Sequence, residues 1–282
     1  MAYPTVSAPY GFKPVNLIGG QVFAGSTRSL PIQYGYATNI FFGDFVVLVR
    51  GTIQRATVTS ATSGNLATGV FLGCNFTDPV TKQKRFSQFW PASTLAGDAV
   101  AVVTDDPDTV FKAAAVTTQG GLLIGSFAIR HIGCNVIASD LVGNINTGDS
   151  SNGIVAPTTT PVTTSLPIRI VDIVRDTAQS YSATGSSATT TITLTGAGLP
   201  VAIPAGTDVA YLAGNGQLIE TGSYVAAAAV AGATSVTLDA TIAVPGGVTA
   251  IPASSTIVFT VYPEALVKIQ FGNHSYYTAT GA

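Results

Sequence analysis

Two histidines and two cysteines are the residues of this sequence best suited to acid–base or nucleophilic chemistry: His131, His274, Cys74 and Cys134. A catalytic cysteine needs its base within hydrogen-bond reach, and only His131 and Cys134 are close in sequence. Three residues apart on a strand-like segment, their side chains would point to opposite faces of a sheet. Two cysteines also make neither a disulfide framework nor a four-ligand zinc site. We therefore expect buried free thiols and no Cys–His catalytic pair.

Three carboxylates are crowded together in the sequence Asp105-Asp106-Pro107-Asp108. Carboxylates grouped on a turn can bind Ca²⁺. This stretch lacks the glycine and the distal glutamate of an EF-hand loop, and Asp and Pro are common turn residues. We expect a solvated turn after a strand over 99–103, with no metal and no cofactor bound. Asp105, Asp106 and Asp108 are the only candidate metal ligands.

Motifs of common enzyme classes are missing from the sequence. It contains no GxSxG, HExxH, P-loop or GxGxxG pattern. The absence of these motifs, together with the small number of titratable residues, favours a structural or interaction protein over an enzyme, and we expect no catalytic residues.

The net charge is −2, and Lys82, Lys84 and Arg85 form the only basic cluster. A nucleic-acid partner is not expected, because the electrostatic footprint is missing.

The elements that would position these residues are short strands. Runs rich in β-branched and aromatic residues are separated by Gly, Asp, Asn and Pro, as is typical of an all-β protein. Examples are residues 45–49, 69–73, 99–103, 121–124, 168–174 and 266–271.

Charge is scarce along the chain. The 282 residues include 12 Lys or Arg and 14 Asp or Glu, or 9% charged residues, against about 25% in ordinary domains. Mean hydropathy is +0.43, yet no run of 18 apolar residues is present, so we expect no membrane association. The N-terminus has no charged and apolar leader of the secretory type, which indicates synthesis in the cytoplasm.

Composition divides the chain into three parts. Residues 1–16 carry Pro4, Pro9 and Pro14 among aromatic residues, which predicts an extended N-terminal arm. No Lys or Arg occurs from Asp176 to Val267, where the sequence is rich in Ser, Thr, Ala and Gly. We expect an inserted antiparallel β-sandwich over 177–263, immunoglobulin-like or jelly-roll-like. The barrel or sandwich body is then discontinuous, over 17–176 and 264–282, and the strand-like runs at 168–174 and 266–271 would pair with each other.

Four stretches together resemble a known family: APYGFKPVNLIGG (Ala8–Gly20), GVFLGCNFTD (Gly69–Asp78), FSQFWPA (Phe86–Ala92) and VKIQFGNHSYY (Val267–Tyr277). They are similar to virion structural proteins of tailed bacteriophages, especially phages of marine and other aquatic bacteria and of cyanobacteria. The resemblance covers about residues 8–175 and 265–282 and leaves the insertion outside. It implies a capsid decoration or cement protein.

A cement protein adds contact area across the joints between capsomers. The small number of charged residues in this chain suits that role, because the cores of protein interfaces are depleted in charged residues. The resemblance thus implies a protein on the capsid exterior, with the major capsid protein and its own copies, as a homotrimer, as partners. We expect the insertion to project outward and to be available for contact with a host surface. Aromatic residues of the arm and the C-terminal tail would anchor the subunits: Tyr3, Tyr10, Phe12, Phe271, Tyr276 and Tyr277.

Two alternative functions remain open. A component of the phage tail or baseplate would belong to the same virion class. A bacterial surface adhesion protein with a carbohydrate-binding β module at 177–263 would belong to another class, and it would be expected to carry an export signal or an anchor.

Overall fold

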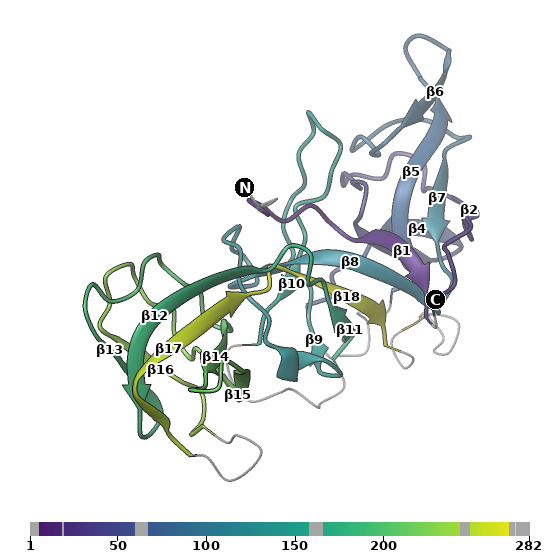
Figure 1. Ribbon diagram of the computed structural model, residues 1–282. Helices are drawn as coiled ribbons and strands as arrows, with labels where there is room; N and C mark the ends of the chain where they lie inside the picture. Colours follow the sequence, from purple (N-terminus) through teal and green to yellow (C-terminus); the bar gives the residue numbers. More distant parts are fainter. Residues whose placement is uncertain are drawn as a thin grey trace.

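The structure is a computed structural model that describes residues 6–18, 20–59, 67–157, 166–242, 249–270 and 274. Regular structure in these residues is almost entirely β-strand, with one short 3₁₀ helix, η1 (Ile129–His131). The strands form three six-stranded sheets, which follow one another along an elongated molecule (Figure 1). The all-β class predicted from the sequence is confirmed.

The outer sheet lies at one end of the molecule and has the order β2-β7-β5-β3-β4, with β6 paired to β5. Its strands are β2 (Arg28–Pro31), β3 (Phe45–Val49), β4 (Thr52–Arg55), β5 (Gly69–Thr77), β6 (Lys84–Ser87) and β7 (Val100–Thr104). β5 and β6 form a hairpin that projects away from the rest of the chain (Figure 1).

The central sheet has the order β1-β8-β18-β11-β9, and β10 pairs with β8. Its strands are β1 (Lys13–Leu17), β8 (Thr109–Val116), β9 (Asn135–Val136), β10 (Ile154–Val155), β11 (Ile168–Ile173) and β18 (Glu264–Ile269). Because β1 pairs with β8, residues 13–16 belong to this sheet. This corrects the boundary of the predicted arm, whose last four residues are a strand.

The outer and central sheets share a hydrophobic core. Phe45 and Val70 of the outer sheet are buried in the same cluster as Phe111 and Val267 of the central sheet. A second cluster of buried residues, which contains Trp90, is formed by side chains of the outer sheet and of the segments that connect its strands. The described residues of the predicted body, within 17–176 and 264–282, therefore form two sheets packed on each other, with one shared core and one separate core.

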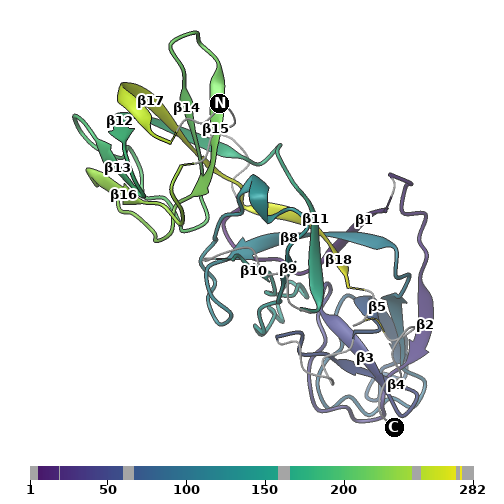
Figure 2. The ribbon, with the colours of Figure 1, turned by 90° about the horizontal axis from the view of Figure 1, so that it is seen from below.

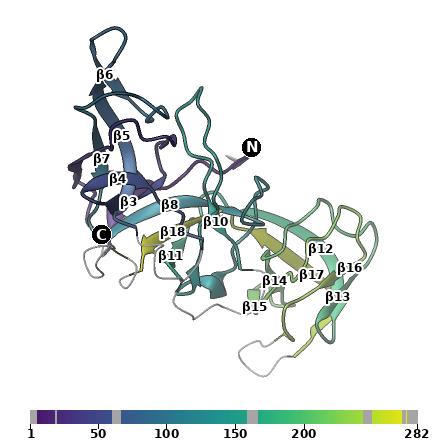
Figure 3. The ribbon, with the colours of Figure 1, turned by 180° about the vertical axis from the view of Figure 1, so that it is seen from behind.

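The third sheet forms a module whose strands all lie between residues 179 and 261, inside the range predicted for the insertion. In sheet order they are β15 (Leu218–Tyr224), β14 (Asp208–Leu212), β17 (Ile251–Val261), β12 (Gln179–Ser187), β13 (Thr191–Leu194) and β16 (Ser235–Thr237). Val225, after β15, bridges Leu238, after β16, so the two edges of the sheet meet. The module is one curled sheet around its own core (Figure 3).

Two antiparallel strand pairs connect the module to the body. β12 pairs with β17 in the module, and β11 pairs with β18 in the central sheet, where Arg169 is opposite Lys268. The predicted pairing of the strand-like runs at 168–174 and 266–271 is confirmed where the ladder is described, over 168–173 and 265–269. Seen from below, the module and the outer sheet lie at opposite ends of the central sheet (Figure 2).

Candidate partner-binding surface

Four of the six aromatic residues predicted to contact partners, Tyr3, Phe271, Tyr276 and Tyr277, lie outside the described residues. The other two, Tyr10 and Phe12, are described. Phe12 is 0% exposed, and its ring centroid lies 4.3 Å from that of Phe45 in the shared core. The expectation that Phe12 contacts a neighbouring subunit is corrected, because its ring stabilises the protein's own body.

Tyr10 is also engaged within the chain. Its hydroxyl donates a hydrogen bond to the buried carboxylate of Glu264, and Lys112 Nζ lies 3.4 Å from the same carboxylate oxygen. The ammonium of Lys13 lies 4.8 Å from the centroid of the Tyr10 ring. Burial, together with the bond to Glu264, raises the pKa of Tyr10 well above its ordinary value. Tyr10 therefore holds the N-terminal segment on the first residue of β18.

Replacing Tyr10 with phenylalanine is expected to lower the free energy of unfolding by about 1–3 kcal/mol, because the Glu264 carboxylate loses its donor while it stays buried. Urea denaturation measures the change. The matched control is Tyr34→Phe. Tyr34 is 61% exposed, so removal of its hydroxyl group should change the free energy of unfolding little. Equal effects of the two substitutions would show that the bond to Glu264 contributes nothing.

The three acidic residues considered as candidate metal ligands lie in the turn between β7 and β8. Asp105 pairs with Arg28 at 2.8 Å and Asp108 with Lys268 at 2.9 Å, while Asp106 Oδ1 accepts the Asp108 N–H. Across the described residues, no group of three or more His, Cys, Asp or Glu side chains is arranged to hold a metal ion. The turn is as expected, but Asp105 is buried rather than solvated.

His131 and Cys134 are placed differently from the expectation. His131 ends η1 and Cys134 follows it, so neither residue lies on a strand. The Nδ1 atom of His131 accepts the Ala128 N–H at 3.0 Å, and the Cys134 thiol donates to the Arg130 carbonyl at 3.7 Å. Each of the two side chains thus forms a hydrogen bond with a backbone group of the same turn. This arrangement supports a structural role.

Stability should depend on pH through His131. Burial, with the nearby Arg130 guanidinium, lowers the pKa of His131 from 6.5 to about 4. The unfolded chain therefore binds a proton between these values that the folded chain does not bind. The contribution of neutral His131 is complete above pH 6.5 and is lost as the pH falls towards 4, by about 3 kcal/mol in total.

Urea denaturation of the wild type and of His131→Asn at several pH values tests this dependence. The asparagine amide oxygen can still accept the Ala128 N–H, but the side chain does not titrate. We expect the variant to lose less stability than the wild type between pH 6.5 and 4. Parallel pH profiles would contradict the assignment.

Two projecting segments of the body each carry two exposed apolar side chains. Val80 and Phe86 belong to the β5/β6 hairpin and are 86% and 80% exposed; Val142 and Ile145, in the segment between β9 and β10, are 75% and 60% exposed. The hairpin and this segment project on the same side of the molecule (Figures 1 and 3). Gln88 joins their bases by donating to Asp149 at 2.9 Å. We call these four side chains the hairpin–loop surface.

A groove of about 600 Å³ lies beside the hairpin–loop surface. Its lining is mostly apolar and consists of Phe42, Leu72, Gly73, Cys74, Asn75, Phe86, Ser87, Gln88 and Val102. Burial raises the pKa of Cys74 to about 12, so the thiol stays protonated and is a poor nucleophile. The apolar lining of this groove is suited to contact with another protein, and the protonated Cys74 thiol is not a nucleophile for catalysis.

Sequence reasoning missed this surface, although Phe86 lies in one of the stretches that carry the family resemblance. The signal was present in the hairpin, where Val80 and Phe86 stand among the charged residues Asp78, Lys82 and Arg85. Apolar residues in such a polar hairpin are expected to be exposed, because their neighbours in sequence do not form a hydrophobic core.

Among the described residues, no helix has the length and apolar character needed to cross a bilayer. Comparison of the chain with protein-family models, with curated proteins and with solved structures finds no match in any of the three.

Proposed function

We propose that this protein is a structural component of a tailed-phage virion that binds the outside of the capsid and joins neighbouring capsomers as a trimer. The hairpin–loop surface is the observation that carries the proposal. Side chains such as Phe86 are exposed on projecting segments of the β body, where they can contact another protein. The resemblance of four sequence stretches to phage virion proteins supports the same role.

The use of the charged residues also favours assembly over catalysis. The buried acids of the body, Asp44, Asp105 and Glu264, pair with Arg55, Arg28 and Lys112, and Asp108 of the β7–β8 turn pairs with Lys268. These groups stabilise the fold. A surface with few charges can be committed to neighbouring subunits, because the cores of interfaces are depleted in charge.

A particle reconstruction tests the proposal. Virions that contain this chain should show its density as a trimer over the junctions between capsomers, in contact with the major capsid protein. Density on the tail would support the tail alternative, and absence of the chain from purified virions would contradict both virion functions.

A substitution tests the contact surface. The double variant Phe86→Asp and Val142→Asp should reduce capsid occupancy at least about tenfold, because charges would be buried unpaired in the interface. The matched control is Leu123→Asp, since Leu123 is 75% exposed but lies outside the hairpin–loop surface. Full occupancy of the double variant would contradict the role of this surface.

A further inference from the structure

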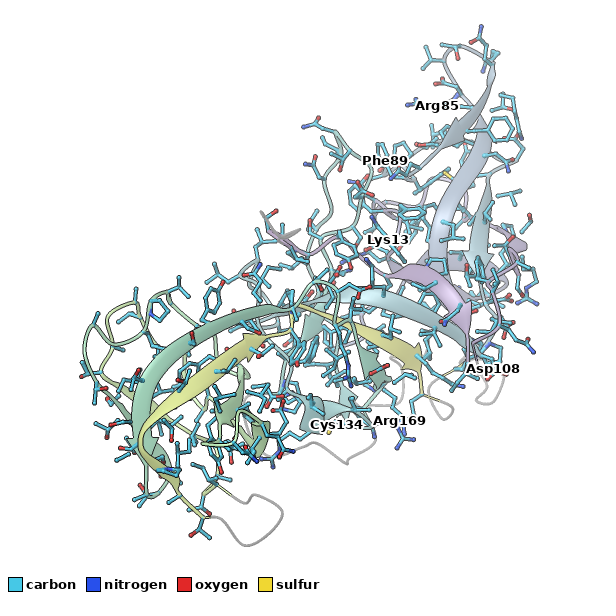
Figure 4. The ribbon with its side chains drawn as sticks, viewed as in Figure 1. Lys13, Arg85, Phe89, Asp108, Cys134 and Arg169 are labelled. Atoms are coloured by element: carbon cyan, nitrogen blue, oxygen red, sulfur yellow. The ribbon has the colours of Figure 1, made fainter. Side chains whose placement is uncertain are left out.

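A second groove lies on the face of the central sheet that carries Arg169 and Lys268, next to η1. It has a volume of about 500 Å³ and is lined by Ile18, Ile132, Gly133, Arg169, Ile170, Val171, Lys268 and Gln270. Its walls are aliphatic, and its two charged groups are both cations. It is separate from the hairpin–loop surface, as the positions of Arg169 and of Arg85 on the hairpin show (Figure 4). We call it the β11/β18 groove.

The two cations of the β11/β18 groove are direct neighbours. Arg169 of β11 stands opposite Lys268 of β18 in the antiparallel ladder, so their side chains share one face. Like charges directly opposite each other destabilise a sheet. In a chain with only 12 Lys and Arg residues, this juxtaposition places positive charge where an anionic group would relieve the repulsion.

Arg169 is the cation available for a ligand. Lys268 is already paired with Asp108 at 2.9 Å, whereas no described carboxylate forms an ion pair with Arg169. Asp172, the other charged residue of β11, accepts the backbone N–H of Ile173 at 2.8 Å. The Nε of Arg169 donates to the Gly133 carbonyl at 3.2 Å, which orients the guanidinium at the groove, and among the described residues no bond to its terminal N–H groups is found.

A guanidinium fixed through Nε suits a carboxylate, because its terminal N–H groups form a fork that matches the two carboxylate oxygens. The aliphatic walls at Ile18, Ile132 and Val171 suit apolar side chains beside that carboxylate. We propose that the β11/β18 groove binds a peptide segment of a partner protein in which a carboxylate side chain is flanked by aliphatic residues. This goes beyond the proposed virion role, because it names the chemistry of a ligand and its test needs no virion.

Titration of the full chain with the peptide acetyl-Leu-Glu-Leu-Glu-Leu-amide, followed by NMR or calorimetry at low salt, tests the proposal. The control peptide has glutamine in place of both glutamates. We expect the glutamate peptide to bind at least about tenfold more tightly, since a charge-assisted bond to arginine is lost in the control. Equal binding of the two peptides, or no binding of either, would overturn the proposal and leave the virion proposal untouched.

Substitutions locate the site. Arg169→Gln should weaken binding of the glutamate peptide about tenfold or more, and Arg169→Lys should weaken it less, because charge remains but the fork is lost. The matched control Arg85→Gln removes an exposed arginine of the hairpin and should leave binding unchanged. An equal loss in Arg85→Gln, or displacement of the peptide by an equal concentration of inorganic phosphate, would mean non-specific anion binding and would overturn the proposal.

Discussion

Replacing Asp44 with alanine is expected to lower the free energy of unfolding by about 3–5 kcal/mol, as the breaking of buried ion pairs does in general. The Asp44 side chain is 0% exposed. One carboxylate oxygen accepts the Phe41 N–H at 3.0 Å and lies 3.3 Å from Arg55 Nε; the other accepts bonds from the Ser150 hydroxyl at 2.5 Å and the Asn152 amide at 2.8 Å. Alanine would leave all four donors without this acceptor.

The position of these donors explains the size of the expected effect. Phe41 and Arg55 belong to the outer sheet region, whereas Ser150 and Asn152 belong to the projecting segment between β9 and β10. Asp44 therefore fastens that segment to the body. Arg55 extends the network, because its Nη2 lies 2.7 Å from Asp140 and donates to the Leu141 carbonyl at 2.8 Å.

Urea denaturation of Asp44→Ala and Asp44→Asn measures the contribution. Asparagine keeps one acceptor but presents an amide donor to the existing donors, so we expect an intermediate loss. The matched control is Asp149→Ala, in the same segment, because among the described residues the Asp149 carboxylate accepts a single side-chain bond, an exposed one from Gln88, and its loss should matter little. A change below about 1 kcal/mol in Asp44→Ala would contradict the role of the network.

Strand content and the pairing of the two linking strands were predictable, because both depend on local pattern. Short β-branched runs between turn residues predict strands wherever they occur. The pairing of β11 with β18 followed from the change in composition between Asp176 and Val267, since strands that flank an insertion must meet at its two ends. Neither inference needs a side-chain contact.

The long-range polar contacts were not predictable from the sequence. Asp44 interrupts an apolar run, and nothing near it in sequence indicates that Ser150 and Asn152 complete its hydrogen bonds. Phe12 shows the same limit for apolar groups. An aromatic residue beside prolines signals burial, but the pattern does not distinguish the protein's own core from that of a neighbour. The β11/β18 groove likewise depends on a register that places Arg169 opposite Lys268.

Replacing Gly206 with alanine is expected to destabilise the protein by about 2–5 kcal/mol and to disturb the junction between module and body. Gly206 has a φ of +83°, and a Cβ added there would lie 2.2 Å from the carbonyl oxygen of Ser126, just before η1. The left-handed conformation costs an alanine about 1–2 kcal/mol. The overlap adds about 1–3 kcal/mol, because backbone and not a flexible side chain must move.

The contacts between η1 and the module explain why the junction should respond to this substitution. Arg130 of η1 donates to the Asp239 carboxylate at 2.8 Å and to the Gly222 carbonyl at 3.0 Å, and the Ile129 N–H donates to Asp208 at 3.3 Å. These bonds hold η1 against the module. An alanine at Gly206 would push Ser126, and with it η1, away from these acceptors.

Gly216→Ala separates this effect from backbone strain alone. Gly216 has a φ of +81°, but nothing lies within 4 Å of an added Cβ, so this variant should lose only about 1–2 kcal/mol. Limited proteolysis, with cleavage sites mapped by mass spectrometry, should show faster cleavage near residues 174–178 and 262–263 in Gly206→Ala than in Gly216→Ala. Equal stability and equal cleavage of the two variants would show that Ser126 yields without cost and that η1 does not set the position of the module.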